Sequence, residues 1–153
     1  MACRAFFEGW RKEFLTKTMC AGARMSSRIS LQMPARYGIA SPIALGYSNG
    51  ANIAAAVLLL RPSALAGAIL LRATPPLAHP NPVKLDGVPV LIVSGARDPI
   101  IQPDSAARLA SLLERYGATV EHQVFPVGHD LSQADVTLAQ RWWNRQGLAA
   151  TNN

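Results

Sequence analysis

Three residues whose types cooperate in nucleophilic catalysis follow one another along the chain: a serine, an aspartate and a histidine. Ser48 is the middle residue of the pentapeptide Gly46–Gly50, which reads Gly-Tyr-Ser-Asn-Gly, and Asp98 and His129 come later. A serine hydroxyl is a poor nucleophile near neutral pH and needs a base within hydrogen-bond distance. We expect His129 to take the proton of Ser48 and return it to the leaving group, while Asp98 fixes the imidazole tautomer.

The pentapeptide Gly46–Gly50 has the context of a sharp turn from a strand into a helix. The apolar run Pro42–Leu45 precedes it, and the Ala- and Leu-rich stretch Ala51–Leu60 follows it. A Gly-x-Ser-x-Gly turn in this context holds its serine in a strained conformation above the sheet, where substrate can reach it. Glycines at both ends avoid crowding where strand and helix cross. The N–H group of Asn49, at the helix N-terminus, is a candidate oxyanion donor.

The segments before Asp98 and His129 have the patterns of strands. Val90–Val93 is a continuous apolar run, which predicts a strand buried on both faces of a parallel sheet. Thr119–Phe125 is expected to be a strand, whose successive residues point to alternate faces of the sheet. The serine, the aspartate and the histidine therefore each follow the C-terminal end of a predicted strand. Open α/β sheets build their sites at that edge.

One more strand, three helices and a long loop complete this map. The strand is predicted at Ala66–Leu71, and the helices at Asn49–Leu60, Asp104–Tyr116 and Ser132–Gln146. The segment Arg72–Asp86 contains four prolines, which a central strand does not tolerate, so we expect a loop that leaves the catalytic edge of the sheet. A plain connection between two strands is the alternative for this loop. The candidate substrate-binding residues are Tyr47, Arg72, Thr74 and Leu77.

Other residues compete for these roles. Asp104 begins a predicted helix after a proline, where a capping role is sufficient. Asp130 directly follows the histidine and would point away from its ring. Asp98 itself precedes a proline and has the composition of an ordinary turn. The remaining histidines, expected to be solvated or packed, are His79 and His122.

Three motifs, considered together, resemble the phospholipase/carboxylesterase branch of the α/β-hydrolase superfamily. The resemblance extends over roughly Tyr37 to Trp143, and its motifs are Gly46–Ala54 (GYSNGANIA), Ser94–Pro99 (SGARDP) and Gly128–Leu131 (GHDL). It implies a fold in which Ser48, Asp98 and His129 are the catalytic triad. Asn49 stands where many relatives carry a glutamine. The resemblance also implies a serine esterase for small carboxylic esters, thioesters or lysolipids, with no cofactor and no metal.

The stretch before the serine departs from this family. A complete hydrolase of this kind has several strands upstream of its serine, and one of them leads into a His-Gly loop that supplies a second oxyanion N–H group. About 40 residues precede the elbow strand here, and none of them is a histidine. We therefore predict a truncated α/β-hydrolase core of about four parallel strands flanked by helices, with the strand of Ile43 at or near an edge.

This departure leaves three interpretations of function. The first is a serine hydrolase that cleaves small esters through an acyl-serine intermediate. The second is an inactive or partner-dependent hydrolase fragment, since loss of one oxyanion donor typically reduces turnover about 10²–10³-fold. The third is an interaction module that associates through an exposed sheet edge, for which a homodimer is the expected assembly. A lyase or haloperoxidase on the same scaffold has no distinguishing residue here.

Composition and charge divide the chain into two parts, residues 1–36 and 37–153. The net charge is +6, and the first 40 residues carry seven basic against two acidic side chains, so the remainder is nearly neutral. We expect residues 37–153 to form the hydrolase domain and residues 1–36 to be a poorly defined or partly helical basic segment. A diverged gene start, a remnant of a family helix and an organellar transit peptide are the alternatives for that segment.

Composition also limits the cofactors and partners that we expect. Half of the residues are apolar, as in a folded domain, and no apolar run approaches the roughly 20 residues that span a bilayer. Basic and aromatic residues show no common organisation of the kind that nucleic-acid binding requires. Cys3 and Cys20 are expected to be free thiols in a reducing compartment, so we expect a cytoplasmic protein. The expected partner is a small-molecule ester.

Overall fold

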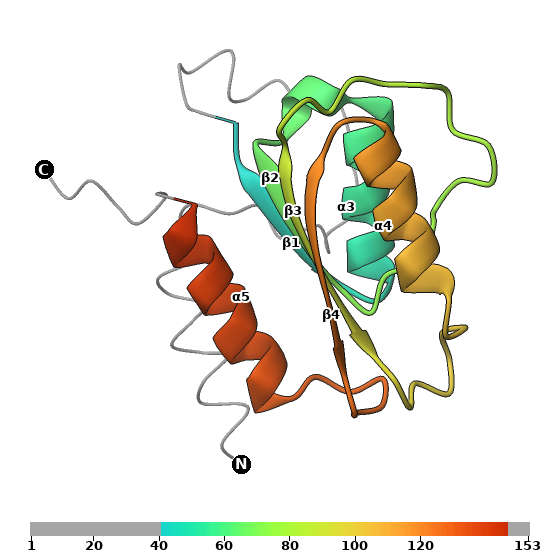
Figure 1. The fold of residues 1–153 in the computed structure, drawn as a ribbon, viewed down its shortest axis with the longest axis vertical. Coiled ribbons are helices and arrows are strands. Elements are labelled where there is room, and N and C mark those ends of the chain that lie inside the picture. Colours follow the sequence, from blue (N-terminus) through green and yellow to red (C-terminus); the bar gives the residue numbers. More distant parts are fainter. Residues whose placement is uncertain (1–40, 147–153) are drawn as a thin grey trace, which may run out of the picture.

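The computed structural model describes residues 41–146 and shows a parallel sheet with helices on both faces (Figure 1). The strands are hydrogen-bonded in the order β1-β2-β3-β4, and every pair is parallel. The predicted sheet of about four parallel strands is confirmed, and β1 forms one edge of it among the described residues. The predicted segment 1–36 lies outside these residues. The strand bounds are β1 Ile43–Tyr47, β2 Gly67–Leu71, β3 Pro89–Gly95 and β4 Thr119–Phe125.

The helices lie where the sequence predicts them. Helix α3 has the predicted bounds, while α4 and α5 each begin one residue later and end one residue earlier than predicted. Helices α3 and α4 cover one face of the sheet and α5 covers the other (Figure 1). No helix within residues 41–146 is both long and apolar enough to cross a membrane. The helix bounds are α3 Asn49–Leu60, α4 Ser105–Arg115 and α5 Gln133–Arg145, with a short 3-10 helix, η1, at Pro62–Ala64.

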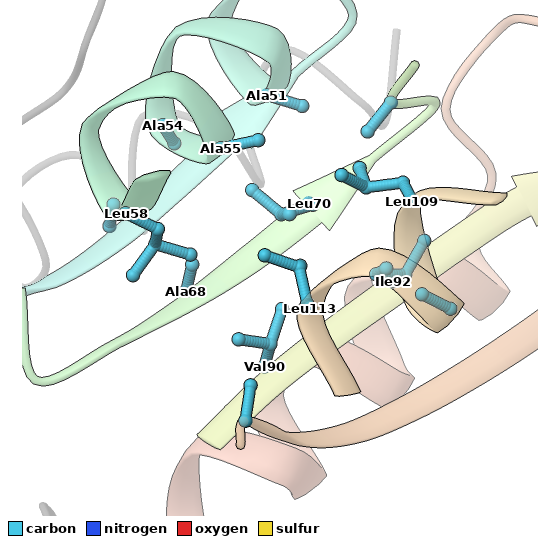
Figure 2. Close-up of a cluster of buried hydrophobic side chains, with 14 of the residues drawn as sticks. Ala51, Ala54, Ala55, Leu58, Ala68, Leu70, Val90, Ile92, Leu109 and Leu113 are labelled. Atoms are coloured by element: carbon cyan, nitrogen blue, oxygen red, sulfur yellow. The ribbon is translucent and has the colours of Figure 1, made fainter. Parts of the chain in front are cut away.

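The core between the sheet and helices α3 and α4 combines alanines with larger branched residues. Alanines of α3 face Ala68 and Leu70 of β2, so the helix can lie close to the sheet (Figure 2). Leu109 and Leu113 of α4 pack in the same cluster, and both are fully buried. Each buried leucine of this kind contributes about 1.5–3 kcal/mol relative to an exposed one.

The opposite face of the sheet packs against α5. Ile69 and Leu71 of β2 point to this face, and they form a second buried cluster with Ala139 and Trp142 of α5. Strand β2 is therefore buried on both faces, as its continuous apolar run predicts. The two clusters hold the strands rigidly, so the loops that follow β1, β3 and β4 start from fixed positions at one edge of the sheet.

Candidate active site

The loops after β1, β3 and β4 bring the three predicted residues together. The Nε2 atom of His129 lies 3.0 Å from Oγ of Ser48, and its Nδ1 atom lies 2.8 Å from Oδ2 of Asp98. The Asp98 side chain is 3% exposed and that of His129 is 15% exposed, while Ser48 is half-buried. With its proton on Nδ1, the imidazole donates to the carboxylate and leaves Nε2 to accept the serine proton. The imidazole thus links a buried carboxylate to an accessible hydroxyl.

The backbone of Ser48 has the strained conformation that the elbow motif predicts. Its φ is 54° and its ψ is −119°, a combination that a residue with a side chain adopts at a cost of about 1–3 kcal/mol. The surroundings hold this conformation: the N–H group of Ser48 donates to the carbonyl of Leu71 at 2.8 Å. The carbonyl of Ser48 in turn accepts from the N–H groups of Ala51 and Asn52. The strain is therefore stored at the residue whose hydroxyl meets His129.

Gly46 is required by the close crossing of β1 and α3. A Cβ atom at this position would lie 2.5 Å from the backbone nitrogen of Ala51 and 2.5 Å from the carbonyl carbon and oxygen of Gly50. All three of these atoms belong to the backbone, which cannot move aside as the end of a flexible side chain can. The first glycine of the pentapeptide is therefore explained by sterics.

We expect Gly46→Ala to lower the free energy of unfolding by about 2 kcal/mol or more, because overpacking against rigid atoms is destabilising. The measurement is urea denaturation followed by circular dichroism. Gly128→Ala is the matched control, since a Cβ atom there meets only the carbonyl oxygen of Arg97 at 3.8 Å. Equal stability of the two variants would contradict this account of the crossing.

Asp98 is both the acid partner of His129 and the residue that shapes its own turn. Its Oδ1 atom accepts from the N–H groups of Ile100 at 2.9 Å and Ile101 at 3.1 Å, while Oδ2 faces the imidazole. Burial alone would raise the pKa of Asp98. The hydrogen bonds from Ile100, His129 and Ile101 outweigh burial and lower the pKa below its ordinary value. Asp98 is therefore ionised across the neutral range.

Three of the competing residues have other surroundings, whereas Asp130 directly follows His129 in the same loop. Asp104 forms an exposed ion pair with Arg108, one turn along α4. His122 pairs with Ser94 across β3 and β4, with 2.9 Å between Nε2 and Oγ, and burial lowers its pKa. His79 is exposed. Within residues 41–146 no group of three or more His, Cys, Asp or Glu side chains could hold a metal ion.

Tyr47 lies against the histidine. Its ring centroid is 5.4 Å from that of His129, and its hydroxyl donates to the backbone carbonyl of His129 at 3.2 Å. Burial and the negative charge of Asp130 raise the pKa of Tyr47, so the hydroxyl keeps its proton. Tyr47 is 37% exposed. The residue is thus at the site, where it holds the histidine loop, and contact with substrate stays a prediction.

The position of Arg72 does not support the expectation that it lines a substrate pocket. Its side chain has no exposed surface, and two of its nitrogens bind the carboxylate of Asp135 at 2.9 Å each. Arg72 also has a left-handed backbone, with φ 55°. The loop that leaves β2 therefore turns its first side chain inward, beneath the site, because a buried carboxylate there neutralises the guanidinium.

The two other residues of this loop are placed by neighbouring elements. The N–H group of Thr74 donates to Oδ1 of Asn52 in α3 at 2.8 Å, and this bond ties the loop to the elbow helix. Leu77 is half-buried and packs against the core between the sheet and α3. Their contact with substrate remains a prediction.

Asn49 is the first residue of α3, next to Ser48, and it is exposed. The first N–H groups of a helix have no partner within the helix, and the helix dipole places positive charge there. The N–H group of Asn49 therefore remains the predicted oxyanion donor.

Asp135 is the residue of this region that sequence reasoning missed. It occupies the third position of α5, where it forms a capping box with Ser132. Its burial would raise its pKa, but hydrogen bonds from Arg72 and Ser132 lower it, so the carboxylate is charged and fully paired. The spacing Ser-x-x-Asp before a helix is a visible capping signal. Its ion pair with Arg72, 63 residues earlier, has no sequence signal.

Known proteins resemble this chain in sequence and in fold. No protein-family model matches it. The putative hydrolase MhqD of Bacillus subtilis (strain 168) is 36% identical over 101 residues, which make up 66% of this chain and 50% of that protein. The crystal structure of the Bacillus cereus carboxylesterase matches with a TM-score of 0.70 and 34% identity, covering 74% of this chain and 55% of that one.

A carboxylesterase from Mesorhizobium loti is similar to the same degree, with a TM-score of 0.69 and 35% identity over 75% of this chain and 56% of that one. The chain spans about half the length of the relatives that it matches. The chain is therefore an α/β hydrolase by fold, and it resembles the phospholipase/carboxylesterase branch of that superfamily in both sequence and structure.

Proposed function

We propose that the protein is a serine hydrolase that cleaves small carboxylic esters through an acyl-serine intermediate. The observation that carries the proposal is the continuous hydrogen-bonded row from Asp98 through His129 to Ser48. Two independent features support it: the strained backbone of Ser48 and the ionised, buried state of Asp98. The named relatives, a putative hydrolase and two carboxylesterases, favour the same class of reaction.

In the proposed reaction, Oγ of Ser48 attacks the carbonyl carbon of the ester while Nε2 of His129 takes the hydroxyl proton. The negative charge that develops on the carbonyl oxygen faces the N–H group of Asn49 at the start of α3. Collapse of the tetrahedral intermediate breaks the bond to the alcohol oxygen, which receives the proton from His129. Asp98 stabilises the imidazolium throughout.

Water completes the cycle by the same route. It attacks the acyl-serine carbonyl while His129 takes one of its protons, and the second tetrahedral intermediate expels Ser48 as the proton returns to Oγ. The products are the carboxylic acid and free enzyme. Each step passes a proton through Nε2 of His129, which lies 3.0 Å from Oγ of Ser48 in the free protein, so a displaced imidazole would slow all of them.

The second candidate is a partner-dependent or inactive form of the same site. Strand β1 is an edge of the sheet within residues 41–146, and the one oxyanion donor predicted among these residues is Asn49. An oxyanion hole with a single donor would leave the serine reactive but turnover low, since each donor accounts for about 10²–10³-fold. The two candidates therefore differ in turnover and agree on the reactivity of Ser48.

Covalent labelling tests the assembled site. We expect a fluorophosphonate probe to modify the protein once, at Ser48, because His129 activates that hydroxyl. Mass spectrometry of the digested adduct locates the label, and release of p-nitrophenol from a short-chain ester measures turnover. Labelling with turnover supports the hydrolase, and labelling without turnover supports the partner-dependent form. A chain that is folded but unlabelled would contradict the proposal.

A further inference from the structure

Side chains from other elements hold three consecutive carbonyls around the histidine. Nε of Arg72 donates to the carbonyl of Gly128 at 3.1 Å, and Nη2 of Arg72 donates to that of Asp130 at 3.1 Å. Between these two bonds, the hydroxyl of Tyr47 donates to the carbonyl of His129 at 3.2 Å. One guanidinium thus binds the carbonyls of the residues before and after the histidine.

The guanidinium itself is fixed from behind. Nη1 and Nη2 of Arg72 bind the two carboxylate oxygens of Asp135, and Asp135 is fully buried. The same carboxylate accepts from the N–H group and the hydroxyl of Ser132, at 2.7 Å each, at the start of α5. The planar fork of arginine suits this two-point contact and still leaves Nε free for a carbonyl. A lysine ammonium in its place could not hold both carbonyls and the carboxylate in one plane.

The backbone of Arg72 explains how the side chain reaches this position. The residue directly follows β2, and its N–H group donates to the carbonyl of Val93 in β3 at 2.8 Å. Its φ of 55° is rare for a residue with a side chain and costs about 1–3 kcal/mol. A second non-glycine residue with positive φ, besides Ser48, therefore stands at the same edge of the sheet. Arg72 is too deeply buried to contact substrate. Its strained backbone is explained if the residue instead holds the loop of His129 in place.

The loop that carries His129 needs such support because the strand before it, β4, provides few backbone hydrogen bonds to hold it. It follows β4, an edge strand of the sheet within residues 41–146, and the last backbone hydrogen bond that joins it to the loop after β3 runs from the N–H group of Arg97 to the carbonyl of Val127 at 3.0 Å. The imidazole must nevertheless keep both its 2.8 Å contact to Asp98 and its 3.0 Å contact to Ser48. A displacement of about 1 Å can reduce a reaction rate about 10²-fold.

We infer that Arg72 and Asp135 form a positioning pair for His129, which sets the imidazole against Ser48 without touching substrate. The role of His129 belongs to the proposed function, so the inference rests on that function. Tyr47 adds a third anchor through its hydroxyl. The rival interpretation is that the ion pair serves stability alone. Buried ion pairs are often no more stabilising than uncharged groups of similar size, so the two interpretations separate when both charges are removed together.

The central variant is Arg72→Met with Asp135→Asn, which removes both charges and keeps an acceptor oxygen for Ser132. Arg72→Met alone would leave a buried carboxylate unpaired and would confuse unfolding with mispositioning. The matched control is Arg145→Met with Glu121→Gln, which removes an exposed ion pair between α5 and β4. Arg72→Lys is a conservative variant that keeps the charge and loses the fork.

We expect the double variant to melt near the wild type but to lose about 10²-fold in kcat on a p-nitrophenyl ester, with KM changed little. The kcat of Arg72→Lys should lie between those of the wild type and the double variant. The kcat of the surface control should stay within about twofold of wild type. If the double variant does not fold, Arg72→Lys carries the test: a folded lysine variant with reduced kcat supports the pair. A folded double or lysine variant with wild-type kcat would overturn the inference.

A proton NMR signal tests the positioning of His129 independently of whether the protein hydrolyses esters. The Nδ1 proton of His129, hydrogen-bonded to Asp98, should give a low-field signal that His129→Gln abolishes. We expect that signal to shift or broaden in the double variant and to stay in place in the surface control, whether or not the protein turns over esters. An unchanged signal in the double variant would refute positioning. Absence of turnover in the wild type would count against the function alone.

Discussion

Ser48→Ala is expected to reduce kcat on a short-chain p-nitrophenyl ester by about 10⁴–10⁶-fold, the loss typical of a removed serine nucleophile. The reason is geometric: Oγ of Ser48 is the atom that Nε2 of His129 faces at 3.0 Å. Without it, the remaining groups can only assist attack by water. The variant should fold as the wild type does, because within residues 41–146 the hydroxyl bonds only to His129. The measurement is initial rate at saturating ester.

Ser94→Ala is the matched control for this loss. The chain holds a second serine–histidine pair, with Oγ of Ser94 2.9 Å from Nε2 of His122, but Ser94 is only 9% exposed. It lacks the access and the strained turn that Ser48 has, so its replacement should leave kcat within a few-fold of wild type. A Ser48→Ala protein that retains the wild-type rate would contradict the proposed function.

Asp98→Asn is expected to lower kcat by about 10⁴-fold through the wrong imidazole tautomer. An amide oxygen can still accept from the N–H groups of Ile100 and Ile101, so the turn keeps its shape. The amide nitrogen then faces Nδ1 of His129 as a donor and drives the proton to Nε2. A protonated Nε2 cannot accept the proton of Ser48. Loss of less than about tenfold would assign the acid elsewhere, and Asp130→Asn would then be the variant to measure.

The same substitution should change how stability depends on pH. The pKa of Asp98 is lower in the folded protein than its ordinary value of about 3.9, so its ionised form stabilises the fold above that pH. This stabilisation is lost as the pH falls through the lower, folded-state pKa. We therefore expect the Tm of the wild type to fall more steeply below about pH 4 than that of Asp98→Asn.

Asp104→Asn is the control for the pH series. Its carboxylate forms an exposed ion pair with Arg108, and such pairs contribute little to stability. Its Tm should follow the wild-type profile. Asp135, whose pKa is also lowered, remains in every protein of this series and leaves a residual slope. Identical profiles for the wild type and Asp98→Asn would contradict the ionised state assigned to Asp98.

Local patterns along the chain were sufficient to predict the elements. The apolar run of β3 and the Ala- and Leu-rich stretch of α3 each predict their own element, and the structure has both within two residues. Parallel strands end at one edge of a sheet, so residues that follow three such strands must approach one another. The proximity of Ser48, Asp98 and His129 was predictable for that reason.

The burial of a long polar side chain was not predictable in the same way. Arg72 begins a proline-rich loop, a context in which an arginine is usually exposed, and it was expected to face substrate. Its actual position depends on Asp135, a carboxylate 63 residues away that helix α5 carries to the other side of the loop. The sequence around Arg72 and around Asp135 contains no pattern that predicts this ion pair.

The sequence by itself thus determined which residues could do chemistry and at which edge of the sheet they meet, since strand patterns and the elbow glycines act over a few residues. Tertiary structure alone decided how the imidazole is held. The bonds from Arg72 and Tyr47 to carbonyls 128–130 join β1 and β2 to the loop after β4, and each of these contacts depends on packing across the whole sheet. A guanidinium is charged in any setting, and only its surroundings decide whether it meets solvent or a buried carboxylate.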